Sequence, residues 1–375
     1  MKVLMLSYEF PPLGGGGAKV VYGLTKEIAR LGHEIDIVTM GFRGLPRHEM
    51  INGTNIYRVP CLRTSESICS TPEMVSYALS AIPMVLRLIK SKHYDINHTH
   101  FIFPDGLVSY LLKKITKLPY IITAHGSDVP GYNPDRFRIE HKILSPLWKK
   151  IVNDADQLVC LSEALKSLVN KHYSGDKISV IPNGIDIDRF QPIKNKQKRI
   201  LIVSRMFERK GIQYFLKALE GLELAHDINI VGDGPYLQTL KQMVDGQSKK
   251  IKFWGWLPNT SRELKDLYET SSIFVFPSES ENFPMVLLEA MAAGLAIITT
   301  KNTGCEEVVG DSALLVEPRS PIATTEALEK LVDNPDFSRE LGEAARRRLE
   351  ENFTWNVVAS KYIDIYCRFA TDHWQ

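Results

Sequence analysis

Cysteine is scarce in this chain: five residues in 375, scattered, and none of them in a Cys-x-x-Cys pair. An odd number at wide spacings gives neither a disulfide framework nor a zinc site, and it favours a reducing compartment. The sequence also lacks an apolar stretch of the ~20 residues that a membrane-spanning helix needs. Its first apolar run stops at Ser7 and Glu9, which is typical of a strand rather than a signal peptide. These absences predict a cytoplasmic protein.

Net charge is small, with 46 Lys and Arg against 44 Asp and Glu. The distribution is uneven: residues 1–182 carry 22 basic and 16 acidic residues, and residues 183–375 carry 24 and 28. Nothing in this pattern indicates a nucleic-acid partner. The basic half fits either a solvated face or peripheral contact with an anionic membrane surface. We favour the solvated face, because charge asymmetry alone is weak evidence for membrane binding.

Hydrophobic residues make up 44% of the chain and charged residues 24%, as in soluble globular proteins. Short apolar runs alternate with amphipathic segments throughout, which indicates α/β structure with parallel sheets and helices on both faces. The expected strands of the first half are 3–7, 34–39, 56–59, 96–100, 120–123, 157–161 and 178–181. Those of the second half are 199–203, 228–231, 251–253, 273–276, 296–299 and 314–316.

Two such runs, in a chain too long for one ordinary core, predict two doubly wound, Rossmann-like domains. The turn signal Pro182-Asn183-Gly184 and the polar run Lys194-Asn195-Lys196-Gln197-Lys198 mark the boundary region. We assign residues 1–185 to the first domain and 186–354 to the second. Ligands in such sheets bind beyond the carboxyl ends of the strands, so we expect a cleft between the two facing domains.

Two glutamates frame the most informative stretch, residues 278–294. Glu281 lies in a polar loop after the strand 273–276, and Glu289 lies about two turns into the helix that follows Pro284 and ends at Gly294. A helix start attracts anions and polar oxygens, and a carboxylate at each end can bind sugar or ribose hydroxyls. Glu279 is a rival for the first position, and a solvated loop beside a surface glutamate is the alternative to a site.

Basic residues follow the first strand of the second half. Arg205 leaves the strand end, and Lys210 stands before the next helix, with Arg209 as its competitor. Two fixed cations at a helix start suit a diphosphate leaving group because they neutralise the charge that develops on departure. A solvated basic loop is the alternative reading of each residue alone.

Glycine-rich turns follow two further strands. Gly14, Gly15, Gly16 and Gly17 precede a helix, where backbone N–H groups can hold a phosphate; a flexible loop without a ligand is the alternative. This run is not the dinucleotide fingerprint, because position 19 is Lys and the second strand ends without an acidic residue. That disfavours a nicotinamide-dependent oxidoreductase. The segment Gly232-Asp233-Gly234-Pro235 is either a ligand loop or simply a good turn.

Histidines and paired aspartates complete the candidate residues. His125 follows the strand 120–123 beside a glycine and projects toward the expected cleft, and Asp128 is a candidate acceptor contact. His98 and His100 share one face of a strand, and we read them as structural. The strings Asp154-Ala155-Asp156 and Asp186-Ile187-Asp188 lack the setting of a metal site, so no metal is predicted.

The stretch from Glu281 to Glu289, with Phe283 between them, resembles the signature of the retaining glycosyltransferases of family 4, which are group 1 glycosyl transferases with the GT-B fold. Asn282 and Pro284 stand where the family usually has glycines, and Pro284 lacks the N–H that often contacts the donor sugar. The Arg205–Lys210 spacing and the glycine-rich loops fit the same family. The resemblance implies that the carboxyl-terminal helix, about 355–375, crosses back onto the first domain.

The resemblance also implies the roles of the site residues. Arg205, Lys210, Glu281 and His125 would be catalytic, with His125 near the donor sugar. The implied donor-binding residues are Gly15, Gly16, Gly232, Gly234, Pro235, Asn282, Phe283, Pro284 and Glu289, and Asp128 is the acceptor-binding candidate. The donor domain is the second one and the acceptor domain the first. No cofactor is expected, because the nucleotide sugar is a substrate.

The expected function is transfer of a hexose, with retention, from a UDP- or GDP-sugar to a glycan, lipid-linked or small-molecule acceptor, in polysaccharide or glycolipid biosynthesis. A UDP-sugar 2-epimerase of the same architecture is the alternative, and a non-catalytic sugar-nucleotide sensor is a third class. Conversion of a UDP-sugar without any acceptor would indicate the epimerase.

Overall fold

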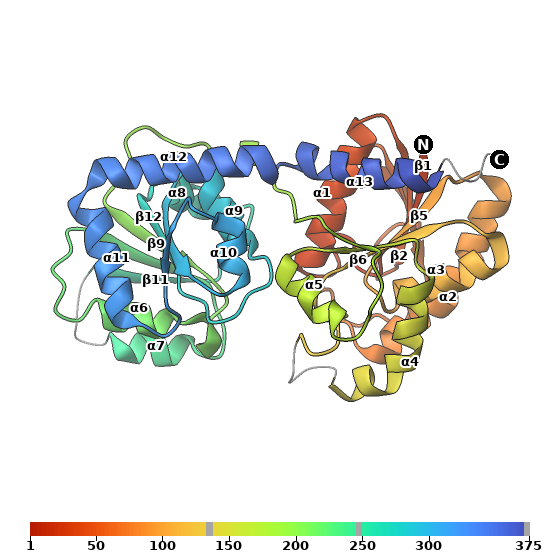
Figure 1. Ribbon diagram of the computed structural model, residues 1–375, viewed down its shortest axis with the longest axis horizontal. Coiled ribbons are helices and arrows are strands. Elements are labelled where there is room, and N and C mark those ends of the chain that lie inside the picture. The colour runs from red at the N-terminus through yellow and green to blue at the C-terminus, as the bar shows by residue number, and fades with distance from the viewer. Residues whose placement is uncertain (133–137, 245–249, 371–375) are drawn as a thin grey trace. The chain divides into compact units, whose positions relative to one another are not determined.

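The computed structural model describes residues 1–132, 138–244 and 250–370. The chain forms two compact units (Figure 1). The amino-terminal domain comprises Met1–Gly184 together with Trp355–Gln375, and the carboxyl-terminal domain comprises Ile185–Thr354. Residues 371–375, part of the expected terminal helix, lie outside the described chain.

The amino-terminal domain has an eight-stranded sheet in the order β3-β4-β2-β1-β5-β6-β7-β8, parallel except for β3 against β4. The strands are β1 (Lys2–Leu6), β2 (Glu34–Met40), β3 (His48–Ile51), β4 (Thr54–Val59), β5 (Ile96–His100), β6 (Tyr120–Ala124), β7 (Gln157–Cys160) and β8 (Ile178–Val180). The helices are α1 (Gly16–Arg30), α2 (Thr71–Ser91), α3 (Asp105–Thr116), α4 (Arg138–Asp154), α5 (Glu163–Asn170) and α13 (Trp355–Ala370).

Alternation along the central strand β1 builds two cores, one on each face of this sheet. Leu4 and Leu6 pack with residues of α2 and α3. Val3 and Met5 pack on the other side with α1 and α13. Successive side chains of a strand point to opposite faces, so a strand buried on both faces is apolar at every position.

The terminal helix α13 packs against α1 within this domain. Gly23 of α1 permits the contact, because a Cβ there would lie 2.2 Å from the Trp355 ring. Tyr362 and Tyr366 of α13 are buried in the same core as β1. The helix thus belongs to the amino-terminal domain although it follows the other domain in sequence.

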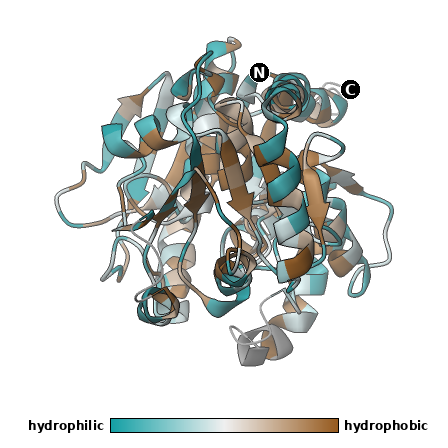
Figure 2. Cartoon of the chain, turned by 90° about the vertical axis from the view of Figure 1, so that its left-hand side faces the viewer, coloured by the Kyte–Doolittle hydropathy of each residue, from teal (hydrophilic) through white to brown (hydrophobic). Residues whose placement is uncertain are grey.

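The carboxyl-terminal domain has a six-stranded, wholly parallel sheet in the order β11-β10-β9-β12-β13-β14. The strands are β9 (Arg199–Val203), β10 (Asp227–Val231), β11 (Ile251–Gly255), β12 (Ile273–Phe276), β13 (Ala296–Thr300) and β14 (Leu314–Val316). The α-helices are α6 (Ile212–Ala218), α7 (Leu237–Met243), α8 (Arg262–Thr270), α9 (Met285–Ala292), α10 (Gly304–Val309), α11 (Pro321–Asp333) and α12 (Pro335–Asn352), and the 3-10 helices are η1 (Ile187–Arg189) and η2 (Glu208–Lys210). Hydropathy colouring shows hydrophobic strands inside and hydrophilic helix faces outside (Figure 2).

The predicted α/β class with two doubly wound parallel sheets is confirmed. The strand β3, the α-helices α4 and α10 and the 3-10 helices η1 and η2 were not predicted. A usable signal existed for β3, because Asn52-Gly53 joins it to β4 and both residues have positive φ, as a two-residue hairpin turn requires. Helix α4 contains Pro146, and α10 has six residues, so neither presents a long regular helical pattern.

One expectation is wrong. Helix α2 is long and apolar enough to cross a membrane by length and composition, although no such segment was predicted. A third of its apolar window is buried, and Tyr77, Ala81 and Val85 lie in the domain core, whereas Leu79 is exposed. Peripheral contact of this basic half with an anionic membrane stays a prediction, which flotation with anionic vesicles would test.

Candidate active site

The strand order of the carboxyl-terminal domain brings Lys210 and Glu281 together. Strands β9 and β12 are neighbours at the point where the strand order reverses, and each is followed by a loop at the carboxyl edge of the sheet. Lys210 ends η2 after β9, and Glu281 lies in the loop after β12. Ligands of doubly wound sheets bind at this switch point. Topology therefore places an ion pair between residues 71 positions apart at the preferred ligand position.

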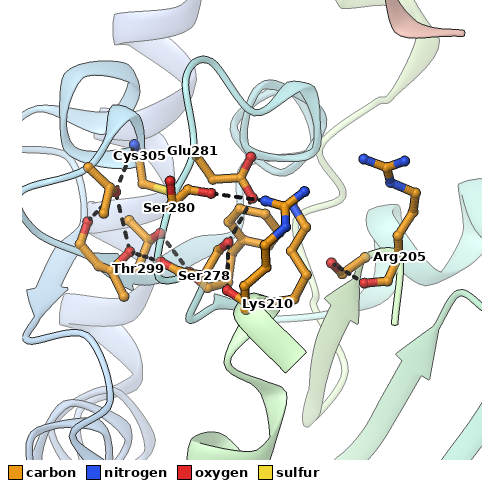
Figure 3. Close-up of polar contacts among 12 residues, drawn as sticks. Arg205, Lys210, Ser278, Ser280, Glu281, Thr299 and Cys305 are labelled. Atoms are coloured by element: carbon orange, nitrogen blue, oxygen red, sulfur yellow. Dashed lines mark hydrogen bonds and ion pairs between the residues drawn. The ribbon is translucent and has the colours of Figure 1, made fainter. Parts of the chain in front are cut away.

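Burial makes this pair unusual for a surface loop. The Lys210 side chain is 8% exposed and forms an ion pair with the Glu281 carboxylate, 13% exposed. Ser278 Oγ donates to Glu281 Oε1 at 2.7 Å, and Figure 3 shows the three side chains converging. Burial lowers the pKa of Lys210, and the nearby Glu281 charge opposes that shift. The site thus holds a fixed cation beside a fixed anion at low solvent exposure.

Glu279 and Arg209, the alternatives to Glu281 and Lys210, lie in different surroundings. Glu279 binds the exposed Arg319, with Nη2 at 2.6 Å from Oε2. Arg209 is exposed, and its main-chain oxygen accepts from the Glu279 N–H at 2.9 Å. The geometry therefore favours Lys210 and Glu281 over Arg209 and Glu279 as the buried charges of this loop pair.

Arg205 lies on the same loop but outside this pair. It is exposed, its guanidinium lies 5.5 Å from the centre of the Phe207 ring, and Figure 3 shows it set apart from Lys210.

The turn after β10 holds the loop of Arg205 in place: Met206 N–H donates to Asp233 O, and a Cβ on Gly232 would lie 1.7 Å from Ser204 O. Gly234 also approaches the loop, since a Cβ added there would lie 2.5 Å from Met206 O. Close packing against the loop after β9 therefore explains why these two positions are glycine. The donor-binding roles of Gly232, Gly234 and Pro235 stay predictions.

Glu289 has partners that the sequence analysis missed. Arg189 Nη1 lies 2.9 Å from Glu289 Oε1, and Tyr268 Oη donates to Oε2 at 2.8 Å. The Glu289 carboxylate is 7% exposed. Burial first, and then the Glu289 charge, raise the pKa of Tyr268 well above its usual value, so its hydroxyl remains a donor. The sequence did offer one sign of this role for Arg189, because it is a cation that follows closely after the domain boundary.

Asn282, Phe283 and Pro284 are packed into the domain. Phe283 is 8% exposed and meets the Phe353 ring edge to face, at 5.6 Å between centres. Pro284 precedes the first residue of α9, where a missing N–H costs no helical hydrogen bond. Gly304 N–H donates to Glu281 O at 3.0 Å, which fixes the turn from the other side.

Replacing Gly304 by Ala should disturb this turn. The added Cβ would lie 1.8 Å from Asn282 O and 2.7 Å from Glu281 O, so backbone must move. We expect the free energy of unfolding to fall by about 1–3 kcal/mol and donor affinity to weaken as Glu281 shifts. Urea unfolding and the donor KM measure the two effects. Gly16→Ala is the stability control, since its Cβ would meet nothing within 4 Å; equal unfolding midpoints for the two variants would contradict the prediction.

The amino-terminal domain places its candidates after β1 and β6. Helix α1 begins at Gly16, and Gly15 N–H donates to Glu9 Oε2 at 3.3 Å. A Cβ added to Gly15 or to Gly16 would meet nothing within 4 Å, so the loop is open there. His125 is held by Asp128, whose Oδ1 accepts from the His125 N–H at 3.0 Å and whose Oδ2 accepts from the Ile102 N–H at 2.8 Å. Burial raises the pKa of Asp128 to about 6. This carboxylate positions the His125 turn, and its acceptor contact stays a prediction.

Two buried histidines, His98 and His100, and the half-buried His125 lie side by side at this turn. His100 Nδ1 lies 3.0 Å from His125 Nε2. His98 has both ring nitrogens in hydrogen bonds, Nδ1 to Tyr366 Oη at 2.7 Å and Nε2 to Thr123 Oγ1 at 2.9 Å. Burial lowers the pKa of His98 and of His125 to about 3 and that of His100 well below its usual value. The neutral forms are therefore the stable ones, and His98 has the structural role that its strand position predicts.

The paired aspartates have local partners. Asp156 and Asp154 bind Lys113 and Lys114 at 2.8 and 2.5 Å. Asp186 Oδ1 accepts from the Asp188 N–H at 3.2 Å and so caps η1. Three of these four aspartates thus have protein partners, and the absence of a metal stays a prediction.

Known glycosyltransferase families and proteins match this chain over nearly its whole length. The model of the family "Glycosyltransferase Family 4" matches residues 14–189, and that of "Glycosyl transferases group 1" matches residues 185–348. An uncharacterized glycosyltransferase of Methanocaldococcus jannaschii is 27% identical, with 98% of each chain covered. Sucrose-phosphate synthase of Thermosynechococcus elongatus has a TM-score of 0.80 at 20% identity, over 98% of each chain. The Anabaena protein HepE, solved with UDP-glucose, has a TM-score of 0.72 at 16% identity, over 98% of this chain and 100% of its own.

The two family models cover adjoining parts of one chain, and the solved relatives share its two-domain GT-B fold. The strand order that brings Lys210 and Glu281 together belongs to the part matched by the group 1 model. This protein therefore belongs to the family 4-like glycosyltransferases and is a glycosyltransferase enzyme.

Proposed function

We propose that this enzyme transfers a hexose, with retention of anomeric configuration, from a UDP- or GDP-sugar to a glycan, lipid-linked or small-molecule acceptor. The buried Lys210–Glu281 pair at the β9–β12 switch point carries this proposal. A nucleotide diphosphate needs a cation that is already in place, and the sugar needs a carboxylate that accepts hydrogen bonds from its hydroxyl groups. The pair offers both at adjoining positions.

In the proposed mechanism, the Lys210 ammonium neutralises charge on the departing phosphate. Fixed cations aimed at developing charge lower the barrier because they need no reorganisation during the reaction. Arg205, on the same loop and exposed, can reach the second phosphate. Glu281 orients the hexose by accepting hydrogen bonds from its hydroxyl groups, and its release from Lys210 would accompany donor binding.

Glu289 binds the ribose in this proposal. Each carboxylate oxygen accepts more than one hydrogen bond, so its contacts with Arg189 and Tyr268 leave capacity for ribose hydroxyls. The contacts fix the carboxylate before the donor arrives, which lowers the entropy cost of binding.

The bond between the anomeric carbon and the phosphate oxygen lengthens first, and the sugar becomes oxocarbenium-like. The acceptor oxygen then attacks on the face that the phosphate leaves. The departing phosphate oxygen takes the acceptor's proton, so no protein base is needed. The neutral His125, whose pKa burial lowers to about 3, would donate to, or accept from, a sugar hydroxyl rather than exchange a proton with the acceptor.

A panel of UDP- and GDP-sugars tests this function. We expect one of them to raise the melting temperature and to be hydrolysed slowly without an acceptor, giving the nucleoside diphosphate. The anomeric configuration of the first-formed product, read by NMR, distinguishes retention from inversion. Conversion to an epimeric sugar nucleotide without an acceptor would indicate the epimerase instead. Failure of every member to bind would refute the donor class.

A further inference from the structure

We propose that the carboxyl-terminal domain has a second anion site: a groove at the amino ends of its strands that binds a phosphorylated small molecule. The groove has a volume of about 930 Å³. Segment 192–198 and helix α12 line it, together with His226 before β10 and Ser272 at the start of β12. Lys210 and Glu281 lie at the carboxyl ends of the same sheet, so this groove is separate from the candidate active site.

Positive charge dominates the lining. The charged residues are Lys194, Lys196, Lys198, Arg339, Arg346 and Arg347, with Glu343 as the single acid. Within α12, positions 339, 343, 346 and 347 share one helical face. Leu341, Ala345 and Leu349 point from the other face into the core. The helix therefore turns its basic face to the groove as a consequence of how it packs.

Several of these cations have no acid to neutralise them. Among the described residues, Lys194, Lys198 and Arg347 have no ion-pair partner, whereas Arg346 binds Glu350 and Arg339 binds Asp336. A solvated basic face is the ordinary reading of such a run. Here the two basic segments, far apart in sequence, line one concave space, and that arrangement favours an anion.

Two further residues of the lining are partly or wholly enclosed. The half-buried Lys196 donates from Nζ to main-chain oxygens, Glu269 O at 2.8 Å and Ala293 O at 2.6 Å, and burial lowers its pKa to about 8. His226 is 7% exposed, and its Nδ1 has no hydrogen-bond partner within the described chain. Because that nitrogen is itself buried, a ligand in the groove would meet the unpaired cations rather than this atom.

The ligand class follows from these donors. Arg guanidinium groups present paired N–H donors that match phosphate oxygens. The volume admits a ligand larger than one phosphate, such as a diphosphate or a phosphate ester with an organic body. A soluble phosphate ester and a phospholipid headgroup share this chemistry, and the experiment separates them.

Titration of the full-length protein with inorganic pyrophosphate at low salt, followed by calorimetry, tests the proposal. The Lys210→Met/Glu281→Gln background removes the buried lysine of the candidate active site without leaving a buried charge unpaired. In that background we expect binding to persist, to weaken at least tenfold in Arg339→Gln/Arg347→Gln, and to tighten severalfold in Glu343→Gln. Arg262→Gln, an exposed arginine outside the groove, is the matched control and should bind as the parent does.

Vesicles of phosphatidylglycerol, tested by co-sedimentation with the same variants, identify the source of the phosphate. Vesicle binding that is lost in Arg339→Gln/Arg347→Gln, without pyrophosphate binding, would assign the groove to a lipid headgroup. The proposal is overturned if Lys210→Met/Glu281→Gln alone abolishes pyrophosphate and vesicle binding, or if Arg339→Gln/Arg347→Gln binds both as tightly as Arg262→Gln does. Neither result depends on glycosyl transfer, so the proposed function is judged separately.

Discussion

Lys210→Ala is expected to lower kcat by about two to three orders of magnitude with the preferred sugar nucleotide, the scale for losing one group that stabilises transition-state charge. The lysine is buried at the β9–β12 switch point, so water would replace its charge poorly. The donor KM should change less than kcat, because the charge on the leaving phosphate grows as the bond breaks. Steady-state release of UDP or GDP measures both constants.

Loss of the lysine also leaves the Glu281 carboxylate without its cation, and breaking one side of a buried pair typically costs about 3–5 kcal/mol of stability. Urea unfolding must therefore accompany the kinetics. Lys210→Met/Glu281→Gln removes both charges and should recover stability without recovering turnover. Arg209→Ala is the control on the same loop and should retain most activity. Near-normal turnover in a folded Lys210→Ala enzyme would refute the assignment.

Three histidines of the amino-terminal domain, His98, His100 and His125, are expected to contribute a loss of stability as the pH falls. Their folded pKa values lie below the ordinary value of 6.5, at about 3 for His98 and His125. The unfolded chain binds more protons below pH 6.5, so stability falls as the pH falls through that value. Between pH 7.5 and 5.5 each histidine contributes a loss of about 1.4 kcal/mol, or about 4 kcal/mol for three.

Two buried carboxyl groups act in the opposite direction. Burial raises the pKa of Asp128 to about 6 and that of Asp105 well above its usual value, so both bind protons more readily when folded. A comparison of variants isolates the histidines. His100→Asn can keep the contact with His125 and should reduce the loss between pH 7.5 and 5.5 by about 1.4 kcal/mol relative to the wild type. Urea midpoints at the two pH values give the difference; an identical loss in both proteins would show that His100 is not a buried neutral group.

Local patterns were enough to locate most strands and the loops that follow them. Strands β9, β12 and β14 have the predicted bounds because each is a short apolar run between polar or turn residues. The hairpin strand β3 was missed although Asn52-Gly53 signals it, because its four residues are two polar residues followed by two apolar ones and so do not alternate in hydrophobicity. The acids and cations of the candidate site were likewise found from their places after strands, because that edge is where doubly wound sheets bind ligands.

The contacts of those residues could not be predicted. The neighbours of Glu289, which are Arg189 and Tyr268, lie 100 and 21 positions away. Asp128 was expected to meet an acceptor, and its oxygens hold two backbone N–H groups. The polar run 194–198 was interpreted as a boundary, and it lines a groove with α12.

Two α/β domains, the alternation of their strands and helices and the residue types at the strand ends can be read from the amino-acid sequence, because hydrophobic period and turn chemistry are local properties. Which charged side chains meet depends on the folded arrangement. The order in which parallel strands pair sets which loops adjoin, and that order depends on packing across the whole sheet. Lys210 meets Glu281 because β9 pairs with β12, and no local pattern records that pairing.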